Sequence, residues 1–536
     1  MKRILYLFAF MLPLLSCRGN GGEVTATMPG SGVGNTSFPV HSALQKMFVD
    51  IGRSAKQYST PDDWEFLMML FCNDLEGADM VMPDSGYNWF SVCGEYSSRS
   101  ANFRNPRIRY RAPYNMIESA NTILDGFGED VDDPNSIWIM AQARALRAWS
   151  YMLLASDFQF NYQVAGDMPC VPIITQEPVD YTNNPRASVR NVYNLIIEDL
   201  NYSVDILEGL GAEWDSRPSK MYIDKNVAHG LRARAYLDMG EWQKACDDAE
   251  CAAQGYKPAT LEEVSKPSFY DIDEHNWIWG YDMTPEVASV YRYATTSSWL
   301  RSFSGWGYVC ATQCYSCINK LLYDKIPEND IRKQWWVDED LNSTLLDGLV
   351  WPGFDDVANA DDGGDTKLPY IPYTNVKFGC YSVGTEANDE DMPLMRVEEM
   401  ILIQAECKAR MGDEAGAKAI LENFVNTYRM ASGTYSAQAG GRSILDEIWF
   451  QRRVELWGEG FGIHDTKRLD KPLVRFHDDE GNIPAAFRFN LPKDDPWLLM
   501  RFPEGALNEN FAIIDNTGGH QPVTDENPGL RDGVTD

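Results

Sequence analysis

The stretch LDMGEWQKA, residues 237–245, has a near copy much further along the chain. The copy is ARMGDEAGA, residues 409–417, and both contain Met-Gly-acid with an alanine five positions after the glycine. Gly240 and Gly412 stand where a helix must end in a left-handed turn, a conformation that glycine adopts without steric cost. Each glycine is followed by a second amphipathic segment. The repeated stretch therefore predicts two helix–turn–helix hairpins.

The flanking sequence is also helical. In residues 136–157, apolar side chains and alanines recur three or four positions apart, which places them on one buried face. Residues 191–207 and 226–239 behave similarly. Two clear hairpins are too few for a long solenoid, so the fold class that we expect is mainly α, with tetratricopeptide-like hairpins built into a larger helical scaffold.

Residues 256–384 differ from the helical parts. They are rich in Trp, Tyr, Gly, Pro and Asp and show few helical periods, which predicts loops and short strands. Long irregular stretches inside a compact chain usually carry function. We therefore expect the ligand-binding region here, inside a single domain that spans residues 37–536.

The first residues form a targeting segment. A basic start is followed by an apolar run, residues 4–15, which is too short to span a bilayer and fits a secretory signal peptide, residues 1–16. Leu-Leu-Ser before Cys17 resembles the bacterial lipoprotein box, in which the cysteine thiol receives a diacylglyceryl group. Several acyl chains hold a protein on a membrane, whereas one gives only marginal binding. Residues 17–36 are then the lipidated N-terminus and a flexible, glycine-rich tether.

The charge of the chain excludes some partners. The formal net charge is −32, and removal of the signal peptide with Lys2 and Arg3 makes it more negative still. No basic patch stands out, so nucleic acid is not an expected partner. The negative charge also opposes lying flat on an anionic leaflet.

The cysteines do not form a recognisable metal or disulfide pattern. Eleven are present, and apart from Cys17 they are scattered, so we expect free thiols in a chain long enough to have a core without disulfides. Cys310, Cys314 and Cys317 have the spacing of half a metal site but lack a nearby His and a second half. Residues 361–365, DDGGD, lack the EF-hand spacing. We expect no metal and no cofactor.

Several motifs together resemble one known family. Beside the lipoprotein box they are YNMIESANTIL (114–124), ARALRAWSYMLLASDF (143–158) with MPCVPI after it, MRVEEMILIQAECKARMGD (395–413), RRVELWGEGFGIHDTKRL (452–469) and ENPGL (526–530). In this order they resemble the SusD/RagB family of Bacteroidetes outer-membrane nutrient-binding lipoproteins, over nearly the whole mature length.

The resemblance implies a fold, a place and a function. It implies a helical scaffold with an inserted irregular region, anchored by lipid in the outer membrane and facing the exterior. It implies a non-catalytic protein that captures an oligosaccharide, or in some members a peptide, for a SusC-like TonB-dependent transporter. The family usually has an arginine where Gly462 stands here, and an acidic run often follows the lipidated cysteine, where this chain has Arg-Gly-Asn-Gly-Gly.

Charged residues in the fifth motif could be mistaken for catalytic groups. Arg452, Arg453, Glu455 and Glu459 lie at helical spacings where opposite charges meet, and we interpret them as an ion-pair network that ties a helix to the scaffold. His464 and Asp465 are adjacent and so do not face each other on a helix, and no nucleophile elbow is nearby. We take them as structural too.

Aromatic side chains in loops are the candidates for ligand contact. Sugars have apolar C–H faces and rims of hydroxyls, so a binding site needs aromatic platforms with amide, carboxylate or guanidinium groups beside them. Two stretches qualify, residues 84–91 and 295–309. Their candidate residues are Tyr87, Asn88 and Trp89 in the first, and Trp299, Arg301, Trp306 and Tyr308 in the second.

Other aromatic residues fit a core better. Trp277, Trp279 and Tyr281 alternate along an expected strand, and the Trp335-Trp336 pair follows a polar segment. We read both groups as scaffold.

Three alternatives to a glycan-binding lipoprotein remain open. The first is a peptide-binding member of the same family. The second is an exported glycoside hydrolase, which needs two carboxylates about 5–9.5 Å apart, a requirement that sequence spacing cannot exclude. The third is an assembly lipoprotein with a groove along its hairpins, against which the large aromatic insert argues.

Overall fold

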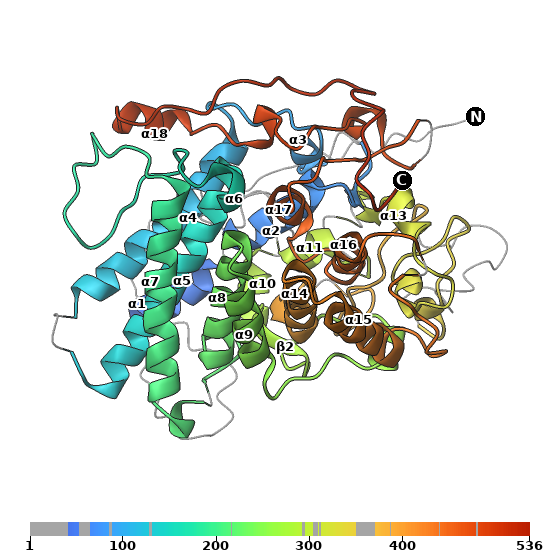
Figure 1. The fold of residues 1–536 in the computed structure, drawn as a ribbon, viewed down its shortest axis with the longest axis horizontal. Coiled ribbons are helices and arrows are strands. Elements are labelled where there is room, and N and C mark those ends of the chain that lie inside the picture. The colour runs from blue at the N-terminus through green and yellow to red at the C-terminus, as the bar shows by residue number, and fades with distance from the viewer. Residues whose placement is uncertain are drawn as a thin grey trace. The chain divides into compact units, whose positions relative to one another are not determined.

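Long helices form a packed series in which each contacts the next (Figure 1). α4 packs on α5, α5 on α7, α7 on α8, α8 on α9, and α9 on α14, which also contacts α15 and α16. The bounds of these helices are α4 (Arg104–Asp125), α5 (Pro134–Phe158), α7 (Val189–Gly209), α8 (Lys225–Met239), α9 (Trp242–Ala253), α14 (Val397–Arg410), α15 (Glu414–Tyr428) and α16 (Ile444–Glu455). The expected mainly α class is confirmed.

This computed structural model describes most of the chain. The described residues are 41–52, 65–84, 88–127, 131–215, 217–291, 295–303, 309, 312–349, 370–385, 387–438, 440–478 and 481–536. They all belong to one compact unit, residues 36–536. The expected signal peptide (1–16), Cys17 and the expected tether up to residue 36 lie outside the described residues.

The helices begin where the sequence supplies a cap. The side-chain oxygens of Asp133, Ser188 and Asp224 accept backbone N–H groups in the first turns of α5, α7 and α8, which satisfies donors that a helix start otherwise leaves unpaired. Pro134 follows Asp133 at a position where its missing N–H costs nothing. The helices predicted over residues 136–157, 191–207 and 226–239 are confirmed.

Both predicted hairpins are present. Gly240 (φ 78°) ends α8 and Gly412 (φ 86°) lies between α14 and α15, so both glycines adopt the left-handed conformation. The two hairpins contact each other through α9 and α14. A hydrophobic cluster fills the space between α14, α15 and α16, and its fully buried members include Leu402, Leu421, Phe424, Val425 and Ile448.

The described part of the region between the hairpins contains only short elements, as expected. They are η2 (Glu263–Ser265), β2 (Trp277–Tyr281), α10 (Pro285–Tyr291), α11 (Thr296–Leu300), β3 (Cys317–Ile318), α13 (Lys320–Tyr323), η3 (Ile331–Trp335) and η4 (Thr344–Leu346). Residues 361–365 and Cys310 lie outside the described residues. Most described residues of this region are buried, and the ligand-binding role expected for it stays a prediction.

Two small antiparallel sheets join distant segments. β2 pairs with β4 (Met392–Arg396), and β1 (Met80–Val81) pairs with β3. Trp277 and Trp279 in β2 are fully buried, as are Trp335 and Trp336, so the scaffold reading of these aromatics is confirmed. The sheets thus attach the irregular region to the helical series.

The remaining helices lie outside this series. They are α1 (Ser42–Asp50), α2 (Glu65–Glu76), α3 (Ser91–Gly94), α6 (Tyr162–Ala165), η1 (Ala212–Trp214), α17 (Gly462–Arg468), η5 (Ala485–Phe487), η6 (Pro496–Leu498) and α18 (Glu504–Glu509). None of the helices in the described ranges has the length and apolarity needed to cross a bilayer.

All nine described cysteines are free thiols, and most are buried. The Sγ atoms of Cys72 and Cys93 lie 3.2 Å apart, a hydrogen-bonding rather than a covalent distance. Burial raises the pKa of Cys170 and of Cys317 to about 12, which keeps both protonated. Over the described part of the chain, no group of three or more His, Cys, Asp or Glu side chains could hold a metal ion.

Candidate ligand-binding site

Trp89, one of the predicted contact residues, lies at the edge of a cavity of about 480 Å³. It precedes α3, and 43% of its surface is exposed; Phe103, immediately before α4, is 40% exposed and lines the same cavity. A volume of this size fits a small ligand. This hollow, hereafter the Trp89 cavity, is also lined by Met68, Cys72, Asn88, Val92, Cys93, Ser98, Arg104, Asn105 and Ile108.

A guanidinium group accompanies the exposed indole. The Cζ atom of Arg104 lies 5.8 Å from the centroid of the Trp89 ring, at the outer limit of a cation–π contact. Arg104 begins α4 directly after Phe103, so two aromatic faces and a guanidinium group share one rim. This combination can stack on an apolar ligand face and donate hydrogen bonds to hydroxyls beside it.

Asn88 holds the loop that carries Trp89. Its Nδ2 donates to the carbonyl oxygen of Pro83 at 3.0 Å, and its Oδ1 accepts the N–H of Phe90 at 3.0 Å. The side chain is buried, so its visible role is to fix the backbone on both sides of Trp89. Tyr87, the third predicted residue of this stretch, lies outside the described residues.

The structure brings the two predicted stretches together through Trp299 in α11. Its ring centroid lies 5.4 Å from that of Phe90, the residue after Trp89, and 4.4 Å from that of Phe71 in α2. Trp299 is fully buried and packs against Phe90, so it supports the loop that carries Trp89. It has no surface that a ligand can touch while these rings stay packed. Trp306 and Tyr308 lie outside the described residues.

Arg301 is also buried and contacts backbone rather than a cavity. Its Nη1 donates to the carbonyl oxygens of Phe269 (3.0 Å) and Gly379 (3.1 Å), and its Nη2 donates to that of Asp391. Burial lowers the pKa of Arg301, although Glu390 opposes this shift. The guanidinium therefore joins three segments of the irregular region and fixes the frame in which α11 sits.

Sequence reasoning missed Phe103 and Arg104. One signal could have found them: Phe103 occupies the position before α4 where Ser, Thr, Asp or Asn usually caps a helix, and it makes no capping side-chain hydrogen bond. An aromatic residue in an N-capping position, followed by arginine, indicates a role other than capping the start of the helix.

The charged residues of the fifth motif form a buried network, as expected. Arg452 pairs with Asp465 (2.7 Å), and Arg453 pairs with Asp79 (2.7 Å) in a segment far away in the sequence. Glu455 accepts from Arg429 at 2.8 Å, and Glu459 accepts from Lys377 and Arg396, both at 2.7 Å. The network ties α16 to the scaffold. One detail differs from the expectation: α16 ends at Glu455, so Glu459 lies beyond the helix.

This network holds its carboxylates ionised. Burial alone would raise the pKa of Glu455, but the guanidinium groups of Arg429, Arg396 and Arg332 hold it well below the usual range. Arg452 and Arg468 likewise lower the pKa of Asp465, although burial alone would raise it. A general acid needs the opposite perturbation, a raised pKa in a ligand-sized cavity.

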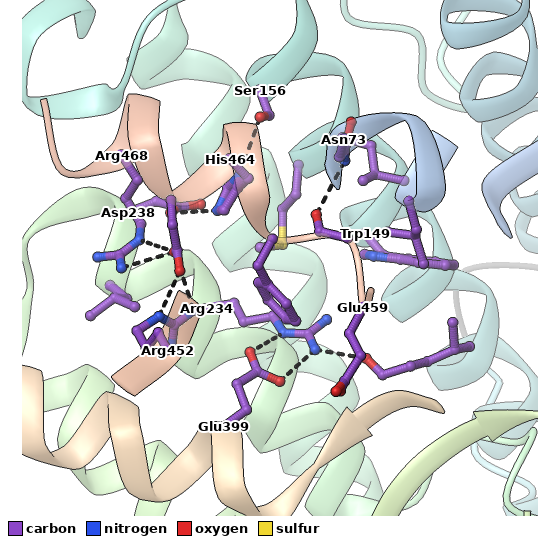
Figure 2. A pocket seen from close by; sticks show the side chains of 18 of the residues that line it. Asn73, Trp149, Ser156, Arg234, Asp238, Glu399, Arg452, Glu459, His464 and Arg468 are labelled. Atoms are coloured by element: carbon purple, nitrogen blue, oxygen red, sulfur yellow. Dashed lines mark hydrogen bonds and ion pairs between the residues drawn. The ribbon is translucent and has the colours of Figure 1, made fainter. Parts of the chain in front are cut away.

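A small cavity of about 60 Å³ lies within the network (Figure 2). Here the Nδ1 of His464 is 3.1 Å from the Oγ of Ser156, and its Nε2 is 3.4 Å from Asp238. The three residue types are those of a catalytic triad, but the space holds only a few water molecules. Ser156 also lies inside α5 rather than on a sharp turn, so the group is structural.

Gly462, where the family usually has arginine, packs closely on Asp74. The carboxylate of Asp74 accepts the N–H groups of Gly460 (2.8 Å) and Gly462 (2.9 Å), and a Cβ at Gly462 would lie 3.1 Å from Asp74 Cα. Burial raises the pKa of Asp74 to about 7, and the two backbone N–H groups only partly offset this. Two backbone N–H groups are therefore the donors that this buried carboxyl group receives from the segment after α16.

Comparison with known proteins agrees with this architecture. A family described as starch-binding and associating with the outer membrane matches residues 38–237, and the SusD family matches residues 280–503. A comparison with curated proteins finds no match.

Solved structures share the fold along nearly their whole length. A SusD-like carbohydrate binding protein from Bacteroides vulgatus is 24% identical, covers 88% of this chain and 96% of its own, and has a TM-score of 0.68. A SusD superfamily protein from Bacteroides thetaiotaomicron is 18% identical, with 89% and 98% covered and a TM-score of 0.66. A laminarin binding SusD-like protein is 17% identical, with 89% and 97% covered and a TM-score of 0.57. These structures share the fold, and the two family matches, over residues 38–237 and 280–503, show that the chain belongs to the SusD/RagB family.

Proposed function

We propose that this chain is a non-catalytic, lipid-anchored protein of the outer membrane, facing the exterior, that binds an oligosaccharide or polysaccharide. It passes this ligand to a SusC-like TonB-dependent transporter. The observation that carries the proposal is the Trp89 cavity, where two half-exposed aromatic rings and a guanidinium group share one rim. Aromatic faces beside hydrogen-bond donors are the chemistry that sugars require.

The residues of the proposed site divide by role. Trp89, Phe103 and Arg104 contact the ligand, and Tyr87, Trp306 and Tyr308 are proposed to extend this surface. Asn88, Trp299 and Arg301 hold its loops through the contacts described above.

Two further observations support binding without catalysis. The described lining of the Trp89 cavity contains no Asp or Glu, whereas glycoside hydrolysis uses a carboxylate pair. Two of the structural neighbours are named for carbohydrate or laminarin binding. The membrane attachment is proposed from Cys17, whose acylation places the protein beside a transporter and raises the effective concentration of its ligand there.

Affinity electrophoresis tests the proposal. The soluble form that begins at Gly19 is run through gels that each contain one polysaccharide, and the same lanes are assayed for released sugar. We expect retardation by one polysaccharide class without release. Sugar release would indicate a hydrolase. Absence of retardation in every gel, with binding of a peptide library instead, would favour the peptide-binding alternative.

A further inference from the structure

A second large cavity, of about 530 Å³, lies on a different part of α4 from the Trp89 cavity. Three segments form it: α4 from Tyr110 to Asp125, the connection between α6 and α7, and α18 with the residue after it. Its polar lining consists of Tyr110, Tyr114, Asn115, Glu118, Asn121, Thr122, Asp125, Thr175, Gln176, Tyr181, Asn184, Glu509 and Asn510. None of these residues belongs to the site proposed above. We call this hollow the Tyr114 cavity.

Hydrogen bonds hold the walls of the Tyr114 cavity in place. The hydroxyl of Tyr114 donates to the carbonyl oxygen of Pro172 at 2.6 Å, which joins α4 to the connection. On the other side, Asn510 Nδ2 donates to the carbonyl oxygen of Asn184 at 2.6 Å, and Asn184 N donates back to Asn510 Oδ1 at 3.1 Å. The connection is therefore attached to both helical walls, and the cavity is formed before any ligand enters.

A buried arginine fixes the amides at its base. Arg147 Nη1 donates to Asn121 Oδ1 (2.6 Å) and Gln176 Oε1 (2.9 Å), so the oxygens of both amides turn toward α5. Asp199 accepts from the Nε and Nη2 of Arg147, both at 2.7 Å, and also pairs with Arg144 at 3.0 Å. The guanidinium of Arg147 is buried, and its donors are directed to protein acceptors behind the wall.

The charge of the lining has one sign. Glu118, Asp125 and Glu509 line the cavity, and no Lys, Arg or His does so among the described residues. None of the three carboxylates forms an ion pair with another described residue. All three residues are exposed, so their carboxylates give this opening a negative potential that repels an anion and attracts a positively charged nitrogen.

Aromatic side chains complete the lining. Tyr181, on the connection, is 64% exposed, and the rings of Tyr110 and Tyr114 lie together in the wall with centroids 4.5 Å apart. Burial, with a contribution from Glu509, raises the pKa of Tyr110 to about 12, so it stays a neutral hydrogen-bonding group. Faces of this kind stack on apolar C–H surfaces and attract cations.

We propose that the Tyr114 cavity is a second binding site, specific for a saccharide that carries a protonated amino group. The cavity has ligand size, its tyrosines and amides match ring faces and hydroxyls, and its unpaired carboxylates select an ammonium over an anion. The proposal extends the proposed glycan binding to a site that does not use Trp89.

Calorimetric titration of the full-length lipoprotein in detergent micelles tests this proposal. The probes are a glucosamine oligomer, the N-acetylated oligomer of equal length and a galacturonate oligomer, at a mildly acidic pH that keeps the amines protonated. We expect binding of the glucosamine oligomer, weaker binding of the neutral oligomer and none of the anionic one. Equal affinity for the first two probes, or no binding of the glucosamine oligomer, would overturn the proposal.

Variants locate the binding. The double substitution Glu118→Gln with Glu509→Gln should weaken glucosamine-oligomer binding about tenfold or more. Glu250→Gln removes the same kind of charge from an exposed position on α9 and should leave it unchanged. Trp89→Ala should also leave it unchanged, while reducing retardation in the polysaccharide gels. Unaltered binding of the glucosamine oligomer by the double variant would refute the second site. Loss of this binding in Trp89→Ala would place the oligomer in the Trp89 cavity and would also refute the second site.

Discussion

Replacing Trp89 with alanine removes the exposed indole face on which the proposed glycan would stack. A tryptophan side chain can bury up to about 250 Å², and 43% of Trp89 is in water, so about 100 Å² is available to a ligand. At about 25 cal/mol per Å², covering half to all of this area contributes about 1.3–2.5 kcal/mol. The dissociation constant should therefore rise about tenfold to seventyfold.

Calorimetric titration with the polysaccharide that retards the protein measures this change. Trp89→Phe keeps an aromatic face and should recover much of the affinity. Trp299→Ala serves as the contrasting variant, because Trp299 is fully buried and its truncation should cost about 3–5 kcal/mol of unfolding free energy. A Trp89→Ala protein that binds within twofold of the wild type, with an unchanged melting temperature, would refute stacking on this face.

Three further predictions concern the scaffold. The pKa of Asp74 is about 7 in the folded chain and about 3.8 ordinarily, so between these values the folded state keeps a proton that the unfolded state loses, and the free energy of unfolding should fall as pH rises from about 4 to 7. Urea unfolding of Asp74→Asn should show a weaker dependence of stability on pH in this range. An unchanged pH dependence would contradict the assignment. Gly412→Ala should lower the free energy of unfolding by about 1 kcal/mol, because the φ of 86° at this residue disfavours a side chain. At both Gly412 and Gly209 an added Cβ meets no atom within 4 Å, but Gly209 has no positive φ, so Gly209→Ala should not destabilise the protein in thermal melts. Equal effects of the two substitutions would rule out backbone strain. Glu455→Gln should destabilise by about 3–5 kcal/mol in denaturant titration, since it leaves Arg429 and Arg396 buried without a full counter-charge, and a loss below about 1 kcal/mol would argue that the network is dispensable.

Much of the scaffold follows from local sequence patterns. The hairpins were predictable because Gly240 and Gly412 impose a turn that few other residues tolerate, and this requirement depends on neighbouring residues alone. The burial of Trp277 and Trp279 followed from their alternation along a strand. Such features need no knowledge of distant segments.

The site was only partly predictable, because burial in a loop depends on which segments meet. Trp89 and Trp299 both stand in turn-rich stretches, yet the first is half-exposed and the second lies under Phe90 and Phe71. Arg301 similarly finds three carbonyl oxygens from segments that sequence does not place nearby. The Tyr114 cavity gave no signal either, since its walls come from three segments far apart in the chain.

The buried thiols are intrinsic probes of local unfolding. A protonated, enclosed thiol does not react with alkylating reagents, so it is modified only when its surroundings open. Cys407 lies in α14, Cys317 in β3 and Cys170 in the connection before α7, so each reports on a different region. The order in which these thiols become alkylated would therefore reveal whether the helical hairpins, the irregular region or the connection beside α18 opens first, with no engineered cysteine needed.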